Sequence, residues 1–119
     1  MARVLVVDDA AFMRVRAAKV LRDAGHEVLE AENGQEAVNK YAESRPDVVL
    51  IDITMPDMDG LAALREIRKL DPSARVAMVT AMGQQAIVME ALKAGAKDFV
   101  LKPFQPERVL ASLRKLLAA

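Results

Sequence analysis

The sequence of 119 residues contains no cysteine, no tryptophan, one tyrosine and three phenylalanines. Without cysteine, the chain can form neither a disulfide framework nor a thiolate metal site. With so few aromatic side chains, stacking against bases or sugars is not expected to be its means of recognition. An excess of charge is also missing, because seventeen acidic residues balance seventeen basic ones. The composition therefore gives no reason to expect a nucleic-acid or membrane partner.

Long hydrophobic runs are absent as well, since no stretch approaches the roughly eighteen apolar residues of a membrane span. The amino-terminal apolar run stops at Asp8 and Asp9 and lacks the features of a signal peptide. We therefore expect a cytoplasmic protein. What the chain does have is 53% hydrophobic residues, enough for a core and too many for disorder. We expect residues 1–119 to form a single domain, because the length allows one core of ordinary size, and we expect a monomer.

Short apolar runs alternate along the chain with amphipathic stretches. The runs predict strands over residues 3–7, 27–31, 47–51, 75–79 and 97–101. The amphipathic stretches predict helices over residues 11–24, 34–45, 60–70 and 84–94 and from residue 106 onward. Strict alternation of this kind is typical of an α/β fold with a five-stranded parallel sheet and helices on both faces. Right-handed crossovers leave two strand orders open, 3-2-1-4-5 and 2-1-3-4-5.

Polar residues stand where four of these strands end. Asp8 and Asp9 follow the first strand, and Asp52 follows the third, within the stretch VVLIDITMPDMDG. Thr80 ends the fourth strand and Lys102 follows the fifth. Ligands of an open parallel sheet bind at the carboxyl ends of its strands. In the order 2-1-3-4-5 the first and third strands are neighbours, so the three carboxylates would converge there.

Three neighbouring carboxylates raise one another's pKa or recruit a cation, and an all-oxygen site of this kind suits Mg2+. Thr80 and Lys102 could donate hydrogen bonds and positive charge to a phosphoryl group. Ala81 is small and would leave an approach open. Such a site could let Asp52 attack phosphorus and form an acyl phosphate. By contrast, Asp57 and Asp59 are better explained as loop and helix-capping residues.

These residues together resemble the receiver domain of two-component response regulators. The resemblance is carried by the Asp8-Asp9 pair, by Asp52 in IDITMPDMDG, by Thr80 in VTAM and by Lys102-Pro103. It extends from end to end of the chain. The stretches DDAAFMR, DITMPDMDG and AMGQQAIVMEALKAGAKDFVLKPFQPERV narrow it to the single-domain chemotaxis regulators of the family. The resemblance implies a doubly wound, flavodoxin-like (βα)5 domain with strand order 2-1-3-4-5.

The resemblance also implies a role for each site residue. Asp52 would be the phosphoacceptor for a histidine of a sensor kinase. Mg2+ would be bound by Asp9 and Asp52 directly, by Asp8 through water and by the backbone carbonyl of Thr54. Lys102 would contact the phosphoryl oxygens, and its peptide bond to Pro103 would be cis.

Three further positions concern the conformational change that phosphorylation would cause. Thr80 would move toward the phosphoryl group, and Phe99 occupies the position of the switch aromatic residue. Many chemotaxis members carry tyrosine there, so any partner contact through that hydroxyl is lost in this chain. Met82 lies at a position that tunes dephosphorylation in the family. Phosphorylation would alter the surface formed by the fourth helix, the fifth strand and the fifth helix, and the implied target is a flagellar-motor switch protein.

Three alternatives remain open on the sequence. A stand-alone receiver could instead be a phosphorelay intermediate that passes its phosphoryl group to a second histidine domain. A phosphatase of the haloacid-dehalogenase type would share the aspartyl-phosphate chemistry, but it carries a DxD pair on its first strand, where this chain has adjacent aspartates. A flavin or nucleotide binder is disfavoured because no glycine-rich phosphate loop follows the first strand. The leading prediction is a signalling switch rather than an enzyme.

Overall fold

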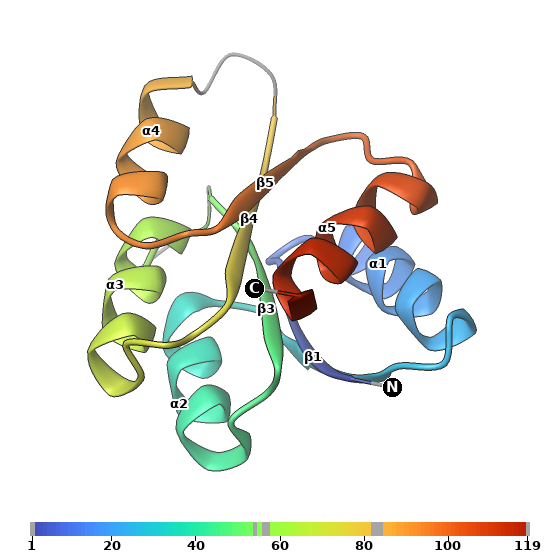
Figure 1. Cartoon of the computed structure of the whole chain (residues 1–119), viewed down its shortest axis with the longest axis horizontal. Helices are drawn as coiled ribbons and strands as arrows, with labels where there is room; N and C mark the ends of the chain where they lie inside the picture. The colour runs from blue at the N-terminus through green and yellow to red at the C-terminus, as the bar shows by residue number, and fades with distance from the viewer. Residues whose placement is uncertain (1, 54, 56–57, 82–84, 119) are drawn as a thin grey trace.

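The computed structural model describes residues 2–53, 55, 58–81 and 85–118. Within them, five strands alternate with five helices along the chain. The strands are β1 (Arg3–Val7), β2 (Glu27–Ala31), β3 (Val48–Asp52), β4 (Val76–Thr80) and β5 (Asp98–Leu101). The helices are α1 (Ala11–Asp23), α2 (Gly34–Ser44), α3 (Gly60–Leu70), α4 (Gln85–Lys93) and α5 (Pro106–Ala118). All strand pairs are parallel and the order is β2-β1-β3-β4-β5 (Figure 1), which confirms the predicted fold.

The sheet separates two apolar cores. Helices α1 and α5 cover one face, and α2, α3 and α4 cover the other (Figure 1). Strand β1 shows the division, because Leu5 and Val7 join the core under α2–α4, whereas Val4 and Val6 join the core under α1 and α5. Successive side chains of a strand point to opposite faces, so a strand covered on both sides must be apolar throughout. In β3 every residue is buried, and that includes its last residue, Asp52.

Three of the helix ends are explained by a capping side chain or a glycine. Asn33 caps α2, because its side chain accepts a hydrogen bond from the backbone N–H of Glu36 at 2.8 Å. Asp59 caps α3 by accepting from the N–H of Ala62 at 2.8 Å, as expected. Gly25, just after α1, has φ +92°, a left-handed conformation that commonly ends a helix. Asp57 lies outside the described residues.

Some predicted boundaries were wrong by one residue. Strands β3 and β4 begin and end one residue later than predicted, and β5 begins at Asp98 rather than at residue 97. The predicted ends followed the change from apolar to polar residues, whereas a strand ends where its pairing with a neighbour ends. Asp52 is paired opposite Val79 of β4 in the parallel ladder, so the ladder carries the strand as far as this acid.

The single histidine of the chain, His26, lies between α1 and β2. Its side chain is half-buried, and its Nδ1 accepts a hydrogen bond from the backbone N–H of Ala2 at 3.0 Å.

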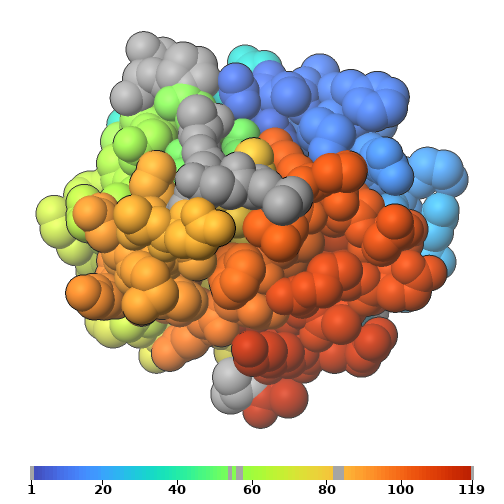
Figure 2. Space-filling view, turned by 90° about the horizontal axis from the view of Figure 1, so that it is seen from above, coloured from blue at the N-terminus to red at the C-terminus, as the bar shows by residue number. Residues whose placement is uncertain are grey.

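Strand β5 and the two helices on either side of it in the chain share one face of the molecule. Figure 2 shows the surface of α4 and β5, in orange, adjoining that of α5, in red. As for membrane association, no described helix is both long enough and apolar enough to cross a bilayer.

Candidate functional site

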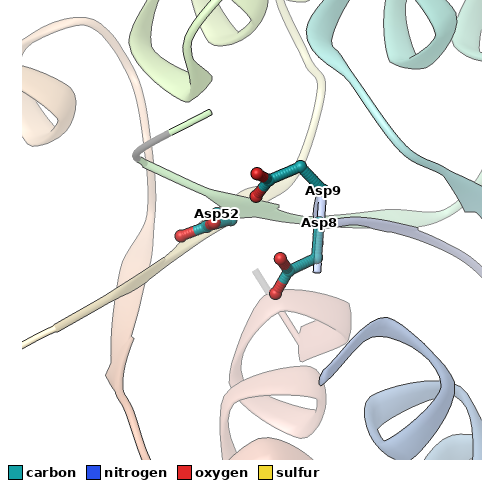
Figure 3. A group of neighbouring side chains, drawn as sticks. All are labelled: Asp8, Asp9 and Asp52. Carbon is teal, nitrogen blue, oxygen red and sulfur yellow. The ribbon is translucent and has the colours of Figure 1, made fainter. Parts of the chain in front are cut away.

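Three carboxylates lie together at the carboxyl edge of the sheet (Figure 3). Asp8 and Asp9 directly follow β1, and Asp52 is the last residue of β3, the neighbouring strand. One carboxylate oxygen from each residue lies within 4.8 Å of those of the other two. The convergence predicted from the strand order is therefore found in the structure.

The two adjacent acids differ in their surroundings. Asp8 is buried, with a relative exposure of 5%, whereas Asp9 is exposed. The backbone N–H of Asp8 donates to the carbonyl oxygen of Ala31 on β2 at 3.1 Å. Its Oδ1 accepts from the N–H of Ala10 at 2.9 Å, and this bond stabilises the turn that leads into α1. Asp8 is thus fixed by its backbone and by its side chain.

Lys102 supplies a positive charge to the cluster from the far end of the chain. Its Nζ lies 3.0 Å from Oδ2 of Asp8 and 3.4 Å from Oδ1 of Asp52. Its backbone N–H donates to the carbonyl oxygen of Thr80 at 2.7 Å, and its peptide bond to Pro103 is cis. Burial by itself lowers the pKa of Lys102, but the hydrogen bond to Asp8 and the charges of Asp52 and Asp8 outweigh burial and raise it. Lys102 is therefore protonated and carries a positive charge at neutral pH.

The site alters the protonation of Asp52. Its pKa is raised to about 6, chiefly by burial, and the nearby charges of Asp8 and Asp9 act in the same direction. Lys102 acts in the opposite direction through its charge and its hydrogen bond. The carboxylate is thus ionised at neutral pH but is partly deprived of water. A poorly solvated anion of this kind is ready to accept a cation or an electrophile.

The other predicted site residues that the structure describes are Thr80, Ala81 and Phe99. Thr80 is 1% exposed and ends β4, and its hydroxyl donates to the carbonyl oxygen of Ala81 at 3.2 Å. Ala81 is exposed. Phe99 lies on β5 opposite Met78 of β4 and packs, half-buried, against the core under α2–α4. The structure does not bring Phe99 to the acids, and Thr54 and Met82 lie outside the described residues.

The donor set fits Mg2+ in its chemistry. Hard divalent cations prefer oxygen ligands, and Mg2+ is usually bound through one or two carboxylates while keeping several waters. Asp9 and Asp52 offer such carboxylates, and the exposure of Asp9 leaves one side of the cluster accessible to water. The cluster therefore could hold this ion.

Two residues that position the site were missed by sequence reasoning. A Cβ atom on Gly60 would lie 2.2 Å from the carbonyl oxygen of Asp52, so only glycine allows α3 to begin this close to the end of β3. The glycine that closes DITMPDMDG was a usable signal for such a close approach. Arg14 donates from Nη1 to the carbonyl oxygen of Asp8 at 2.8 Å. Arg14 closes the stretch DDAAFMR, but the residue pattern alone does not reveal this contact.

Comparison with known proteins agrees with this geometry. The sequence model of the family described as "Response regulator receiver domain" matches residues 4–114. Chemotaxis protein CheY of Thermotoga maritima is 58% identical over 115 residues, which cover 96% of each chain. Chemotaxis protein CheY of Bacillus subtilis is 56% identical over 116 residues, which cover 97% of each chain. A solved structure of chemotaxis protein CheY4 of Vibrio cholerae has a TM-score of 0.93 at 34% identity and covers 98% of this chain and 99% of that one.

The chain therefore belongs to the response regulator receiver domain family. The resemblance to the CheY type of chemotaxis regulator, predicted from the motifs, is confirmed over nearly the full length of the relatives.

Proposed function

We propose that this chain is a CheY-like response regulator that accepts a phosphoryl group on Asp52 from a phosphohistidine of a sensor kinase. The observation that carries the proposal is the cluster of Asp8, Asp9 and Asp52, whose carboxylate oxygens lie within 4.8 Å of one another. The ammonium of Lys102 lies 3.4 Å from Asp52 on the same cluster. Acids and an ammonium in this arrangement suit the transfer of a phosphoryl group, because catalysis of that reaction rests on positioning and charge neutralisation.

In the proposed reaction, an oxygen of the Asp52 carboxylate attacks the phosphorus atom of the donor. A new P–O bond forms and the P–N bond to the donor's imidazole breaks. The electron pair of the broken bond returns to the imidazole nitrogen, and the product on this chain is an acyl phosphate. Because the carboxylate is the nucleophile, Asp52 must be ionised, and its raised pKa of about 6 leaves it ionised at pH 7.

Asp9 and Asp52 are the residues that would hold Mg2+, with Asp8 acting through water and Thr54 through its backbone carbonyl. The ion would supply positive charge to the oxygens of the transferring group. Lys102 would leave the carboxylate of Asp52 and hold a phosphoryl oxygen, which its position between two acids allows. Ala81, exposed beside Thr80, leaves the donor an approach.

The consequence of phosphorylation would be a change of surface. The hydroxyl of Thr80 would turn from the carbonyl of Ala81 toward the phosphoryl group, and Phe99 would move inward from its half-buried position. These movements are a population shift between two packings, driven by contacts to the phosphoryl oxygens. They would act on the face of α4, β5 and α5 (Figure 2). The described residues of α4 and β5 expose four large apolar side chains: Ile87, Met89, Leu92 and Leu101.

The protein would act in the cytoplasm as a signalling switch rather than an enzyme, and residues 1–119 would form one receiver domain that is monomeric. Its phosphodonor would be a sensor histidine kinase, and its target a flagellar-motor switch protein. The relatives named as chemotaxis proteins support this output over a phosphorelay. A relay role would appear as transfer of the phosphoryl group from Asp52 to a second histidine domain.

The proposal is tested by incubating the full chain with Mg2+ and a small phosphodonor and then measuring its intact mass. The wild type should gain the mass of one phosphoryl group. An Asp52→Asn variant should gain none, and chelation of Mg2+ should abolish the gain in the wild type. Equal gains by the wild type and the variant would refute the assignment of the phosphoacceptor.

A further inference from the structure

The guanidinium of Arg14 contacts the backbone that joins the two adjacent acids. Its Nη1 donates to the carbonyl oxygen of Asp8 at 2.8 Å, and its Nε donates to Oε1 of Glu30 at 3.2 Å. The side chain of Arg14 is only 15% exposed, so it is held within the fold. We propose that Arg14 is a positioning residue that orients the peptide between Asp8 and Asp9 and thereby strengthens binding of a divalent cation. The inference rests on the proposed role of the acidic cluster.

The peptide that follows Asp8 determines where Asp9 begins. Because a peptide unit is planar, fixing the carbonyl of Asp8 also fixes the nitrogen of Asp9. Asp9 is exposed and therefore gains little orientation from core packing. Figure 3 shows its side chain leaving the turn after β1 on the side that faces Asp52. The hydrogen bond from Arg14 thus acts on the part of the site that has the least support of its own.

Both ends of Asp8 are tied to the same neighbouring strand, β2. Its N–H donates to the carbonyl oxygen of Ala31, and Arg14 connects its carbonyl to the side chain of Glu30, the preceding residue of β2. Glu30 is itself held by a second cation, because Nη2 of Arg22 lies 3.4 Å from its Oε2. The turn carrying the acids is therefore linked to β2 through a backbone bond on one side and a guanidinium on the other.

The charge of Arg14 and its geometry predict opposite effects on metal affinity. A positive charge near the cluster repels a cation, so removal of the charge alone would strengthen binding. Loss of the hydrogen bond to Asp8 would free the turn and weaken binding, as loss of outer partners of metal ligands does. Glu30 pairs with the guanidinium and offsets its charge. Loss of the hydrogen bond should therefore outweigh loss of the charge. Weaker metal binding by an Arg14 variant would indicate the effect of geometry, and tighter binding would indicate the effect of charge.

The experiment is calorimetric titration of the full chain with Mg2+ alone, for the wild type and three variants. Arg14→Gln should raise the Kd for Mg2+ about tenfold, the lower end of the range for such outer partners. Arg14→Lys can still donate to the carbonyl oxygen of Asp8 but cannot hold Asp8 and Glu30 in one fork, so its Kd should rise less. The matched control is Arg22→Gln, which removes the same charge beside Glu30 without touching Asp8, and its Kd should stay close to that of the wild type.

A second measurement separates positioning from general damage to the fold. At saturating Mg2+, Arg14→Gln should be phosphorylated by the small phosphodonor about as fast as the wild type, with only the Mg2+ requirement raised. If Arg14→Gln fails to fold in a thermal melt, Arg14→Lys carries the test. An unchanged or tighter Mg2+ affinity in the Arg14 variants, or an equal loss in Arg22→Gln, would overturn the inference and leave the proposed function standing. A wild type that does not bind Mg2+ would overturn both.

Discussion

The ammonium of Lys102 lies 3.0 Å from the carboxylate of Asp8, although the two residues are 94 positions apart in the chain. The same ammonium lies 3.4 Å from Asp52. The side chain of Lys102 is 20% exposed, and those of Asp8 and Asp52 are 7% and 10% exposed. A largely buried pair of like charges is tolerated here because an opposite charge lies between them. Lys102 therefore occupies the place of a counter-cation for the acids.

Replacement of that counter-cation should alter metal binding and stability in opposite directions. Lys102→Met should bind Mg2+ more tightly, because the ion no longer competes with the ammonium for the carboxylates. In the absence of Mg2+ the variant should lose about 2 kcal/mol of unfolding free energy, since two buried acids lose their partner. Calorimetric titration and chemical denaturation with and without chelator measure both effects.

The matched control is Lys115→Met, because Lys115 also lies near a buried acid, 3.6 Å from Asp98, but on α5. Its Mg2+ affinity should equal that of the wild type. Weaker Mg2+ binding by Lys102→Met would show that the lysine supports the metal site rather than competing with the metal.

The raised pKa of Asp52 predicts a pH-dependent stability. Between the unfolded pKa of 3.8 and the folded pKa of about 6, the folded state binds the proton more tightly. The contribution of Asp52 to the unfolding free energy therefore falls as pH rises through this window and is constant above it. Asp52→Asn should be more stable than the wild type by about 1 kcal/mol at pH 7, a figure reduced for the residual solvent contact of the site. The difference should shrink as pH falls toward 5.

Denaturant titrations from pH 4.5 to 8, in the presence of chelator, check this expectation. Asp23→Asn serves as the control, because Asp23 forms an exposed pair with Lys19 at 3.0 Å and should change stability little at any of these pH values. A stability gain of Asp52→Asn that stayed constant across the range would contradict the assigned pKa.

Gly60 should be indispensable to the geometry of Asp52. An added Cβ would lie 2.2 Å from the carbonyl oxygen of Asp52 and 2.9 Å from the Cα of Ile53. Both are backbone atoms, which cannot move aside without distorting the end of β3. Gly60→Ala should therefore cost about 3 kcal/mol of unfolding free energy and slow phosphorylation by displacing Asp52.

The comparison for this variant is Gly25→Ala. Gly25 has φ +92° with nothing within 4 Å of an added Cβ, so the change should cost about 1 kcal/mol through backbone strain alone. Its phosphorylation rate, measured where the protein is fully folded, should not change. Equal phosphorylation by Gly60→Ala and the wild type would show that the end of β3 adjusts freely.

Tyr41 should stabilise the contact between α2 and the end of α3 without affecting the acids. Its hydroxyl donates to Oδ2 of Asp71 at 2.8 Å, and the residue is 2% exposed. Burial, followed by the hydrogen bond and charge of Asp71, raises the pKa of Tyr41 above its usual range. Tyr41→Phe should lower the unfolding free energy by about 1 kcal/mol and leave phosphorylation unchanged. Unaltered stability in denaturant titrations would mean that Asp71 finds an equivalent partner.

The sequence allowed the fold and the position of the acids to be predicted, because both depend on local patterns. Apolar runs and caps such as Asp59 indicated the elements, and the carboxyl ends of parallel strands brought Asp8, Asp9 and Asp52 to one edge. The order of the strands came from the family resemblance, since periodicity alone left two orders open.

Contacts that depend on how the elements pack could not be predicted in the same way. The bond from Arg14 to the carbonyl of Asp8 depends on how α1 packs, and no residue pattern reports that packing. The bond between His26 and the N–H of Ala2 depends on the register of β1 against β2. Such contacts are set by how the sheet and the helices pack in three dimensions.

The most direct test of the account is to locate the phosphoryl group on the chain. After treatment with Mg2+ and a small phosphodonor, borohydride reduction converts an aspartyl phosphate to homoserine, and mass analysis of proteolytic peptides identifies the converted residue. Conversion is expected at Asp52 alone. Conversion at Asp8 or Asp9, or a phosphoryl group found on His26 with Asp52 intact, would contradict it.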